Sequence, residues 1–163
     1  MEFQNVTSRD RGAVETLSVL ATAILREYYD PIVGAEQNSY MLDRFQSIHA
    51  IDEQLAHGYT YFLAVSGGEN IGFLAFYPRD GALYLSKLYL RREDRGRGHG
   101  REMLDFVKAQ ANAMNLAAIE LNVNKHNETT RIYEKMGFVR IRSEKNDIGS
   151  GYFMDDYVYR LTL

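Results

Sequence analysis

Cysteine is absent from this chain of 163 residues. Disulfides, thiolate metal sites and a cysteine nucleophile are therefore excluded, and we expect no metal in the functional site. The lack of cysteine also fits the reducing environment of the cytoplasm, which is where we expect the protein to work.

Long apolar runs are missing as well. No stretch approaches the roughly 18–20 apolar residues that a membrane-spanning helix requires, and the N-terminus has no signal-peptide pattern, so we expect no membrane association. Hydrophobic residues still make up 45% of the chain and charged residues 25%. This balance is typical of a globular protein, and the length predicts a single domain over residues 1–163.

The chain carries no excess of positive charge. Its net charge is −3, which argues against a nucleic-acid partner. Five arginines nevertheless fall within residues 91–101, which read RREDRGRGHGR. A concentrated positive patch in an otherwise mildly acidic chain indicates a local anionic ligand.

Hydrophobic periodicity and turn residues predict an α/β fold. We expect helices over Val14–Tyr29, Glu36–His49, Ile51–Ala56, Gly100–Asn115 and Glu128–Met136. We expect strands over Tyr59–Val65, Ile71–Tyr77, Ala82–Leu90, Ala117–Val123, Phe138–Arg142 and Phe153–Leu161. Short turns make the first three strands antiparallel, and the strand, helix and strand that follow form a parallel crossover. The predicted architecture is a mixed, mostly antiparallel sheet with helices on both faces.

A glycine-rich loop joins the strand that ends at Leu90 to the helix that starts near Gly100. The first amides of a helix lack internal partners, and glycines at 96, 98 and 100 let a phosphate approach them closely. A charge-assisted hydrogen bond contributes about 1.5–3 kcal/mol, against about 0.3–1 kcal/mol for the helix dipole. Directed amides should therefore dominate phosphate binding, with arginine side chains adding charge around the rim. Taken alone, the glycine-arginine run could also be a solvated loop or part of an RNA-binding tail.

The spacing of this loop matches neither the P-loop nor the dinucleotide fingerprint. It has the form Arg-x-x-Gly-x-Gly from Arg95 to Gly100, and the segment Tyr133-Glu134-Lys135-Met136-Gly137-Phe138 follows at a suitable interval, after Asn127. Together with Tyr84–Leu90 upstream, these segments resemble the GNAT superfamily of N-acetyltransferases.

The resemblance implies acetyl-CoA as cosubstrate, with the glycine loop around its pyrophosphate and the backbone of one strand along its pantetheine arm. The cosubstrate-binding residues that it implies are Leu88, Tyr89, Leu90, Arg95, Gly96, Arg97, Gly98, His99, Gly100, Arg101 and Asn127. GNAT enzymes usually transfer the acetyl group directly to an amine, which suits a chain without cysteine.

Two catalytic residues are suggested. Tyrosine is protonated at neutral pH, since its reference pKa is about 10, so Tyr133 can act as the general acid for the departing thiolate. Plain core packing is the alternative role for Tyr133. An acceptor amine with a pKa of about 10.4 must also lose a proton. Glu120 is a candidate base, and a chain of water molecules is equally compatible with the sequence.

The predicted function is acetyl transfer to a primary amine of a small molecule. The tyrosines and acidic residues between Glu27 and Glu36 could suit a polyamine. Two alternatives stay open: transfer to a peptide or protein amine, and a non-catalytic CoA-binding sensor. The oligomeric state also stays open, although homodimers are frequent in the family.

Overall fold

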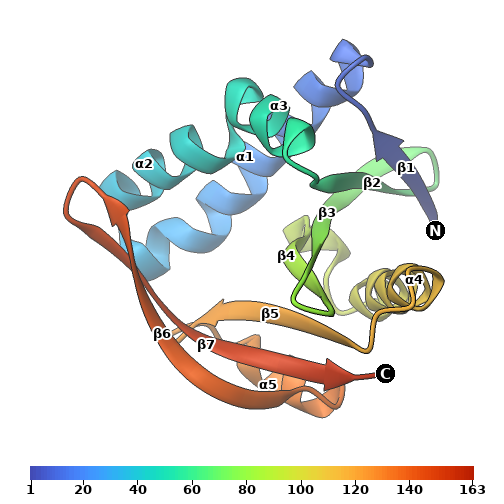
Figure 1. The fold of residues 1–163 in the computed structure, drawn as a ribbon. Helices are drawn as coiled ribbons and strands as arrows, with labels where there is room; N and C mark the ends of the chain where they lie inside the picture. The colour runs from blue at the N-terminus through green and yellow to red at the C-terminus, as the bar shows by residue number, and fades with distance from the viewer. The chain divides into compact units, whose positions relative to one another are not determined.

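The computed structural model describes all of residues 1–163. The internal contacts divide the chain into two compact units: residues 1–77 with 87–106, and residues 78–86 with 107–163. Strand hydrogen bonds give a seven-stranded sheet in the order β1-β2-β3-β4-β5-β7-β6. Figure 1 labels these strands along the chain. Three elements contribute residues to both units, namely β3 (Glu69–Arg79), β4 (Ala82–Leu90) and α4 (His99–Ala113). The extent of the domain as residues 1–163 stays a prediction.

The first unit begins with β1 (Glu2–Val6), which pairs antiparallel with β2 (Thr60–Ser66). The helices α1 (Arg11–Val33), α2 (Ala35–Gln46) and α3 (Ile48–Ala56) lie between these two strands in the sequence. Side chains cap two of them, because Asp10 accepts a hydrogen bond from the amide of Ala13 and Ser47 accepts one from the amide of Ala50.

Helices cover both faces of the sheet in the first unit. On one face, Tyr61 and Leu63 of β2 join the buried side of α1 in a single hydrophobic core. On the other face, the Phe62 ring packs edge-to-face against Phe106 of α4, with ring centroids 4.9 Å apart. Alternation of side chains along β2 explains this division, and it agrees with the predicted arrangement.

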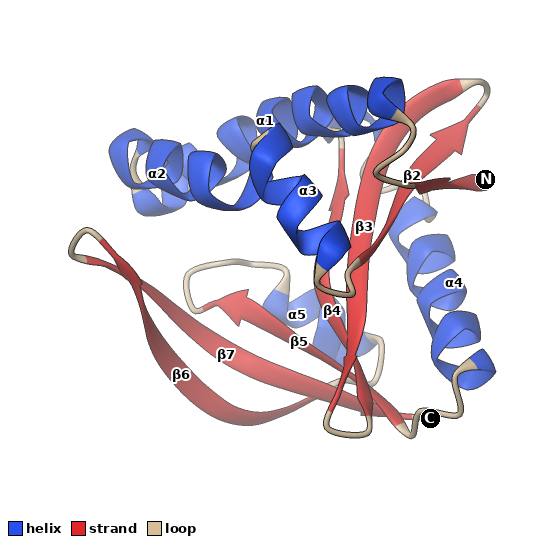
Figure 2. Cartoon of the chain, turned by 45° about the horizontal axis from the view of Figure 1, so that its top comes forward, coloured by secondary structure: helices blue, strands red, loops and turns tan.

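The second unit contains β5 (Ala118–Asn124), α5 (Thr130–Lys135), β6 (Val139–Gly149) and β7 (Tyr152–Thr162). The strands β6 and β7 form one long antiparallel hairpin, and β7 also pairs antiparallel with β5 (Figure 2). The strand β5 pairs in parallel with the start of β4, as the predicted crossover requires. None of the helices in the chain has the combined length and apolar character needed to cross a bilayer.

Several predicted boundaries were wrong. Pro31 lies inside α1, which continues to Val33 and ends at Gly34, where the backbone φ is 89°. Proline is tolerated there, although it removes one helical hydrogen bond, because the helix stops within its next turn. The stretch from 143 to 149 belongs to β6 and not to a loop. The strand β1 was not predicted, because its short polar sequence lacks the usual alternation of apolar residues.

Gly72 lies where β3 passes against the end of β4. A Cβ atom added there would come within 2.3 Å of the carbonyl oxygen of Tyr89 and 3.0 Å of the Leu90 side chain. Because the closest contact is with backbone, it cannot be relieved by a change of rotamer. Glycine at this position therefore allows β3 to approach the two residues that end β4.

We expect Gly72→Ala to lower the free energy of unfolding by about 1–3 kcal/mol, measured by urea denaturation, because the methyl group forces the two strands apart. Gly12→Ala is the matched control. A Cβ at Gly12 would meet only Asp10, at an ordinary 3.6 Å, and alanine in a helix should leave stability unchanged or raise it by about 0.5–1 kcal/mol. Equal stability of the two variants would contradict the close approach at Gly72.

Candidate active site

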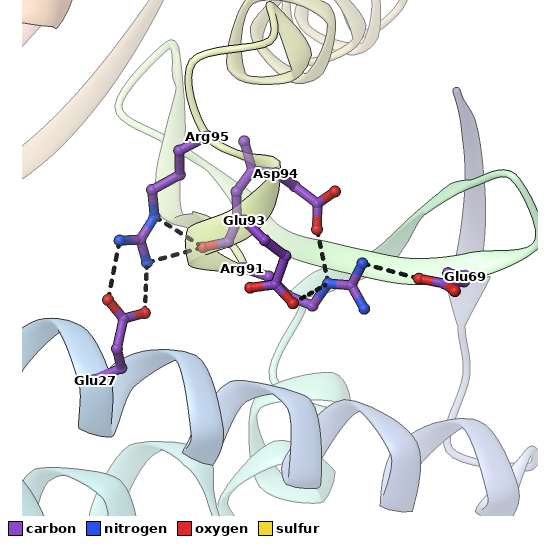
Figure 3. Close-up of polar contacts among 7 residues, drawn as sticks. Glu27, Glu69, Arg91, Glu93, Asp94 and Arg95 are labelled. Carbon is purple, nitrogen blue, oxygen red and sulfur yellow. Dashed lines mark hydrogen bonds and ion pairs between the residues drawn. The ribbon is translucent and has the colours of Figure 1, made fainter.

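The loop of residues 91–101, named the cosubstrate loop after its predicted role, starts at the end of β4. The amide of Arg91 donates to the carbonyl of Ile71 over 2.8 Å, so the chain leaves β4 still attached to β3. A short 3₁₀ turn follows, and buried Asp94 in that turn accepts a hydrogen bond from Arg91 Nε over 2.7 Å. Arg91 also reaches Glu69 on β3 over 3.0 Å (Figure 3). These contacts fix the first half of the loop.

The second half of the loop is the glycine-rich segment. Gly96 and Gly98 have φ values of 75° and 88°, which side chains rarely tolerate, and a Cβ on either would meet open space. The first backbone hydrogen bonds of α4 run from the amides of Arg101 and Glu102 to the carbonyl of Gly98. The amides of residues 96–100 precede those bonds and have no partner within the helix. A bare, amide-rich helix start of this kind fits a phosphate group.

The three arginines that the sequence placed around the phosphate differ in their surroundings. Arg95 donates to the carbonyl of Leu90 and forms an ion pair with Glu27 of α1. Arg97 and Arg101 are exposed. The Nδ1 atom of His99 is buried without a hydrogen bond and lies 3.7 Å from Glu102 Oε1. The structure therefore brings all the predicted loop residues together, but only some of the arginines are free to contact an anion.

In the second unit, Asn127 closes the turn that leads into α5. Its Oδ1 atom accepts from the amide of Thr129 over 2.9 Å and from the Thr129 hydroxyl over 2.8 Å. The helix begins only at Thr130, with Thr129 in the N-cap position, so Asn127 shapes the preceding turn. Tyr133 lies on α5, half-buried, with its ring edge-to-face against Phe138 at 5.4 Å.

The two predicted catalytic residues lie on opposite faces of the sheet in this unit. The hydroxyl of Tyr159 donates to Glu134 of α5, so Tyr159 and its cross-strand partner Leu121 face that helix. Glu120 precedes Leu121 and therefore faces away from α5, where Arg160 donates to it over 2.7 Å. The structure does not bring Tyr133 and Glu120 together.

Sequence reasoning missed a polar network on the face that carries Glu120. The Tyr84 hydroxyl donates to Asn122, and the Asn122 amide lies within hydrogen-bond distance of Glu144 and Asp156. Burial raises the pKa of the Asp156 carboxyl, whereas hydrogen bonding to Arg142 lowers that of Glu144. No sequence signal links these residues, because cross-strand pairing alone joins β4, β5, β6 and β7.

The environment of Lys87, on β4, was not predicted either. Its side chain is 8% exposed, and its ammonium group donates to the Phe45 carbonyl over 3.2 Å, to Gln54 Oε1 over 2.9 Å and to the Tyr61 hydroxyl. None of these partners carries a negative charge. Burial lowers the pKa of Lys87 to about 7 and raises that of the Tyr61 hydroxyl. Lys87 thus ties α2, α3 and β2 to the strand that precedes the loop.

Comparison with known families identifies this arrangement. Residues 27–153, which are most of the chain, match the family model for the GNAT acetyltransferase domain. The chain belongs to the GNAT acetyltransferase family. It is therefore an acyltransferase, and the resemblance noted in its loop and in the Tyr133 segment is confirmed. No curated protein sequence matches it significantly.

Solved structures resemble this GNAT chain along its whole length. The PaiA N-acetyltransferase of Thermoplasma acidophilum, in complex with coenzyme A, has a TM-score of 0.78 at 18% identity, with all of both chains covered. A GNAT family acetyltransferase of Elizabethkingia anophelis with acetyl-CoA bound has a TM-score of 0.68 at 17% identity, over 99% of this chain and 97% of the other. An aminoglycoside 6′-N-acetyltransferase complexed with coenzyme A has a TM-score of 0.66 at 16% identity, with the same coverage. These likenesses confirm the fold and are consistent with acetyl-CoA as the cosubstrate.

We expect the free energy of unfolding to rise between about pH 7 and pH 9, because Lys87 loses its proton near pH 7 in the folded chain. An unfolded lysine keeps its proton to a pH of about 10.4, so the unfolded chain binds more protons in this window. The contribution is at most about 1.4 kcal/mol per pH unit. Urea denaturation of Lys87→Met should show that this slope is lost. The slope should persist in Lys125→Met, which removes a lysine whose ammonium pairs with Asp155 at the surface. An unaltered slope in Lys87→Met would contradict the assignment.

Proposed function

We propose that this chain transfers an acetyl group from acetyl-CoA directly to the primary amine of a small molecule. The observation that carries the proposal is the cosubstrate loop, in which glycines with positive φ precede unpaired amides at the start of α4. Family membership supports the reaction class, and the absence of cysteine fits direct transfer without a covalent enzyme intermediate. Acetyl-CoA supplies an activated thioester carbonyl when it is bound.

We assign the binding of acetyl-CoA to three segments of the chain. The amides of residues 96–100 would bind the pyrophosphate, with Arg97 and Arg101 adding positive charge. The backbone of Leu88, Tyr89 and Leu90 would pair with the pantetheine arm. Asn127 would contribute through the turn that its side chain stabilises.

Tyr133 is the proposed general acid. The reference pKa of a tyrosine hydroxyl is about 10, so such a group carries a proton at neutral pH and can give it to a leaving thiolate. The ring of Tyr133 packs edge-to-face against Phe138, and this contact restrains the ring and hence its hydroxyl. A restrained donor supports this role, since proton transfer depends on geometry before it depends on pKa.

The acceptor is proposed to be a cationic amine that meets the polar face of β5, β6 and β7. Glu120, Glu144 and Asp156 all project from that face. Arg160 pairs with Glu120 and Arg142 pairs with Glu144, which leaves Asp156 to favour a positively charged ligand. Glu120 stays the proposed base, but it lies on the face opposite Tyr133 and Arg160 engages its carboxylate, so a chain of water molecules would have to carry the proton of the amine to it. The acidic residues of α1 support a polyamine less than expected from sequence, because Arg95 engages Glu27 and Asn38 donates to Asp30.

A CoA-release assay separates the candidate functions. We expect release of CoA with a small amine from a panel of polyamines, amino acids, aminoglycosides and peptides. Turnover with peptides alone would favour a peptide or protein N-acetyltransferase. Acetyl-CoA binding without turnover on any acceptor would favour a sensor.

Gly98→Glu should abolish the thermal stabilisation that acetyl-CoA gives to the wild-type protein, because a carboxylate would occupy the proposed phosphate position. Ligand at about 100 times its Kd should stabilise the wild type by about 2.7 kcal/mol. Gly58→Glu is the matched control, since Gly58 also has a positive φ, of 95°, and open space around its Cβ position. Equal stabilisation of wild type and Gly98→Glu would show that the pyrophosphate lies elsewhere.

Tyr133→Phe should reduce kcat by about 100-fold or more while leaving acetyl-CoA affinity unchanged, because it removes only the acidic proton. The measurement is steady-state kinetics with the best acceptor of the panel, together with calorimetric titration of acetyl-CoA. Tyr152→Phe, at the tip of the β6–β7 hairpin, should retain wild-type kinetics. Unchanged kcat in Tyr133→Phe would remove the assignment and leave Tyr133 a packing residue.

A further inference from the structure

The guanidinium group of Arg95 is directed at protein atoms and not at the open side of the loop. Its Nε and one terminal nitrogen donate to the carbonyl of Leu90, over 3.1 and 3.0 Å. Its two terminal nitrogens also reach the two carboxylate oxygens of Glu27, over 3.3 and 3.2 Å, as Figure 3 shows. The same group lies 5.0 Å from the centroid of the Tyr28 ring. Three separate contacts therefore fix its orientation.

Arg91 is restrained in a similar way at the start of the loop. It contacts Asp94 within the 3₁₀ turn and Glu69 on β3. Figure 3 places the Arg91 group and the Arg95 group on either side of this turn, so that they hold the loop to two different elements, β3 and α1. Arg92, Arg97 and Arg101 are exposed and make no such contacts.

We propose that Arg95 is a positioning residue that works as a pair with Glu27, and that it sets the cosubstrate loop on α1 without binding phosphate itself. The inference rests on the proposed binding of acetyl-CoA by the loop. It assigns a functional role to Glu27, a residue of the helical region outside the loop.

The physical reason is the cost of ordering a flexible segment. Fixing the backbone of one residue costs about 1–2 kcal/mol, and glycines at 96 and 98 have more freedom to lose than other residues. A loop that is already held when the ligand arrives has met part of this cost during folding. Because Arg95 immediately precedes Gly96, its contacts with Leu90 and Glu27 restrain the point at which the glycine-rich segment begins.

The test is a double-mutant cycle on acetyl-CoA affinity, measured by calorimetry on the full chain. We expect Glu27→Ala and Arg95→Ala each to raise Kd by about two- to five-fold, the range for a half-exposed ion pair. The Kd of the double variant for acetyl-CoA should not exceed the higher of the two single-variant values, because both changes remove the same contact. In contrast, when Arg97→Ala is combined with Glu27→Ala, the increase in Kd should equal the product of the two single-variant increases, because the two changes remove separate interactions.

A conservative variant separates positioning from charge. Arg95→Lys keeps the positive charge but cannot reach Leu90 and both oxygens of Glu27 together. We expect it to bind acetyl-CoA as weakly as Arg95→Ala. Wild-type affinity in Arg95→Lys would show that charge alone matters, which would overturn the proposal.

The matched control is another ion pair of α1. Arg11 contacts both carboxylate oxygens of Asp52 over 2.7 and 2.9 Å, and we expect Asp52→Ala to leave acetyl-CoA affinity unchanged. If the wild type fails to bind acetyl-CoA, the proposed function fails, and this role fails with it. If the wild type binds and Glu27→Ala binds equally well, only the positioning role is overturned.

Discussion

The end of β4 is the point on which the cosubstrate loop depends. There the backbone of β3 comes so close that only glycine fits at residue 72, and the amide of Arg91 continues the pairing to Ile71. The carbonyl of Leu90 then accepts from the Arg95 side chain. Strand pairing, steric contact and side-chain hydrogen bonding thus converge on three successive residues, so the loop leaves a fixed point and not a frayed end.

The same strand carries a buried amine a few residues earlier. Lys87 satisfies its three N–H groups with a carbonyl, an amide oxygen and a hydroxyl, all of them neutral. Removing an ammonium group from water without a carboxylate partner is costly, and the low pKa of Lys87, about 7, reflects that cost. The arrangement links the helical region to β4 through polar contacts that hydrophobic packing alone would not specify.

The sequence allowed part of this structure to be predicted. The helices with clear apolar periodicity and the glycine-rich loop follow local rules, so the turn at Gly96 and Gly98 and the helix start after it could be predicted. The partners of Arg95 and Lys87 could not be predicted, since Glu27 and Tyr61 are brought close only by tertiary packing. The reach of α1 through Pro31 also went unrecognised, because a proline in the last turn of a helix removes only one hydrogen bond and need not end the helix at once.

The placement of Tyr133 and Glu120 on opposite faces of one sheet has an evolutionary consequence. Successive residues of a strand point to opposite sides, so Leu121 and Glu120 belong to different chemical environments although they are adjacent in the sequence. Substitutions around Asn122 and Glu144 can therefore reshape the polar face without disturbing the packing of α5 against the opposite face. A sheet of this kind lets one surface diversify among descendants of a common ancestor while the opposite surface stays constant.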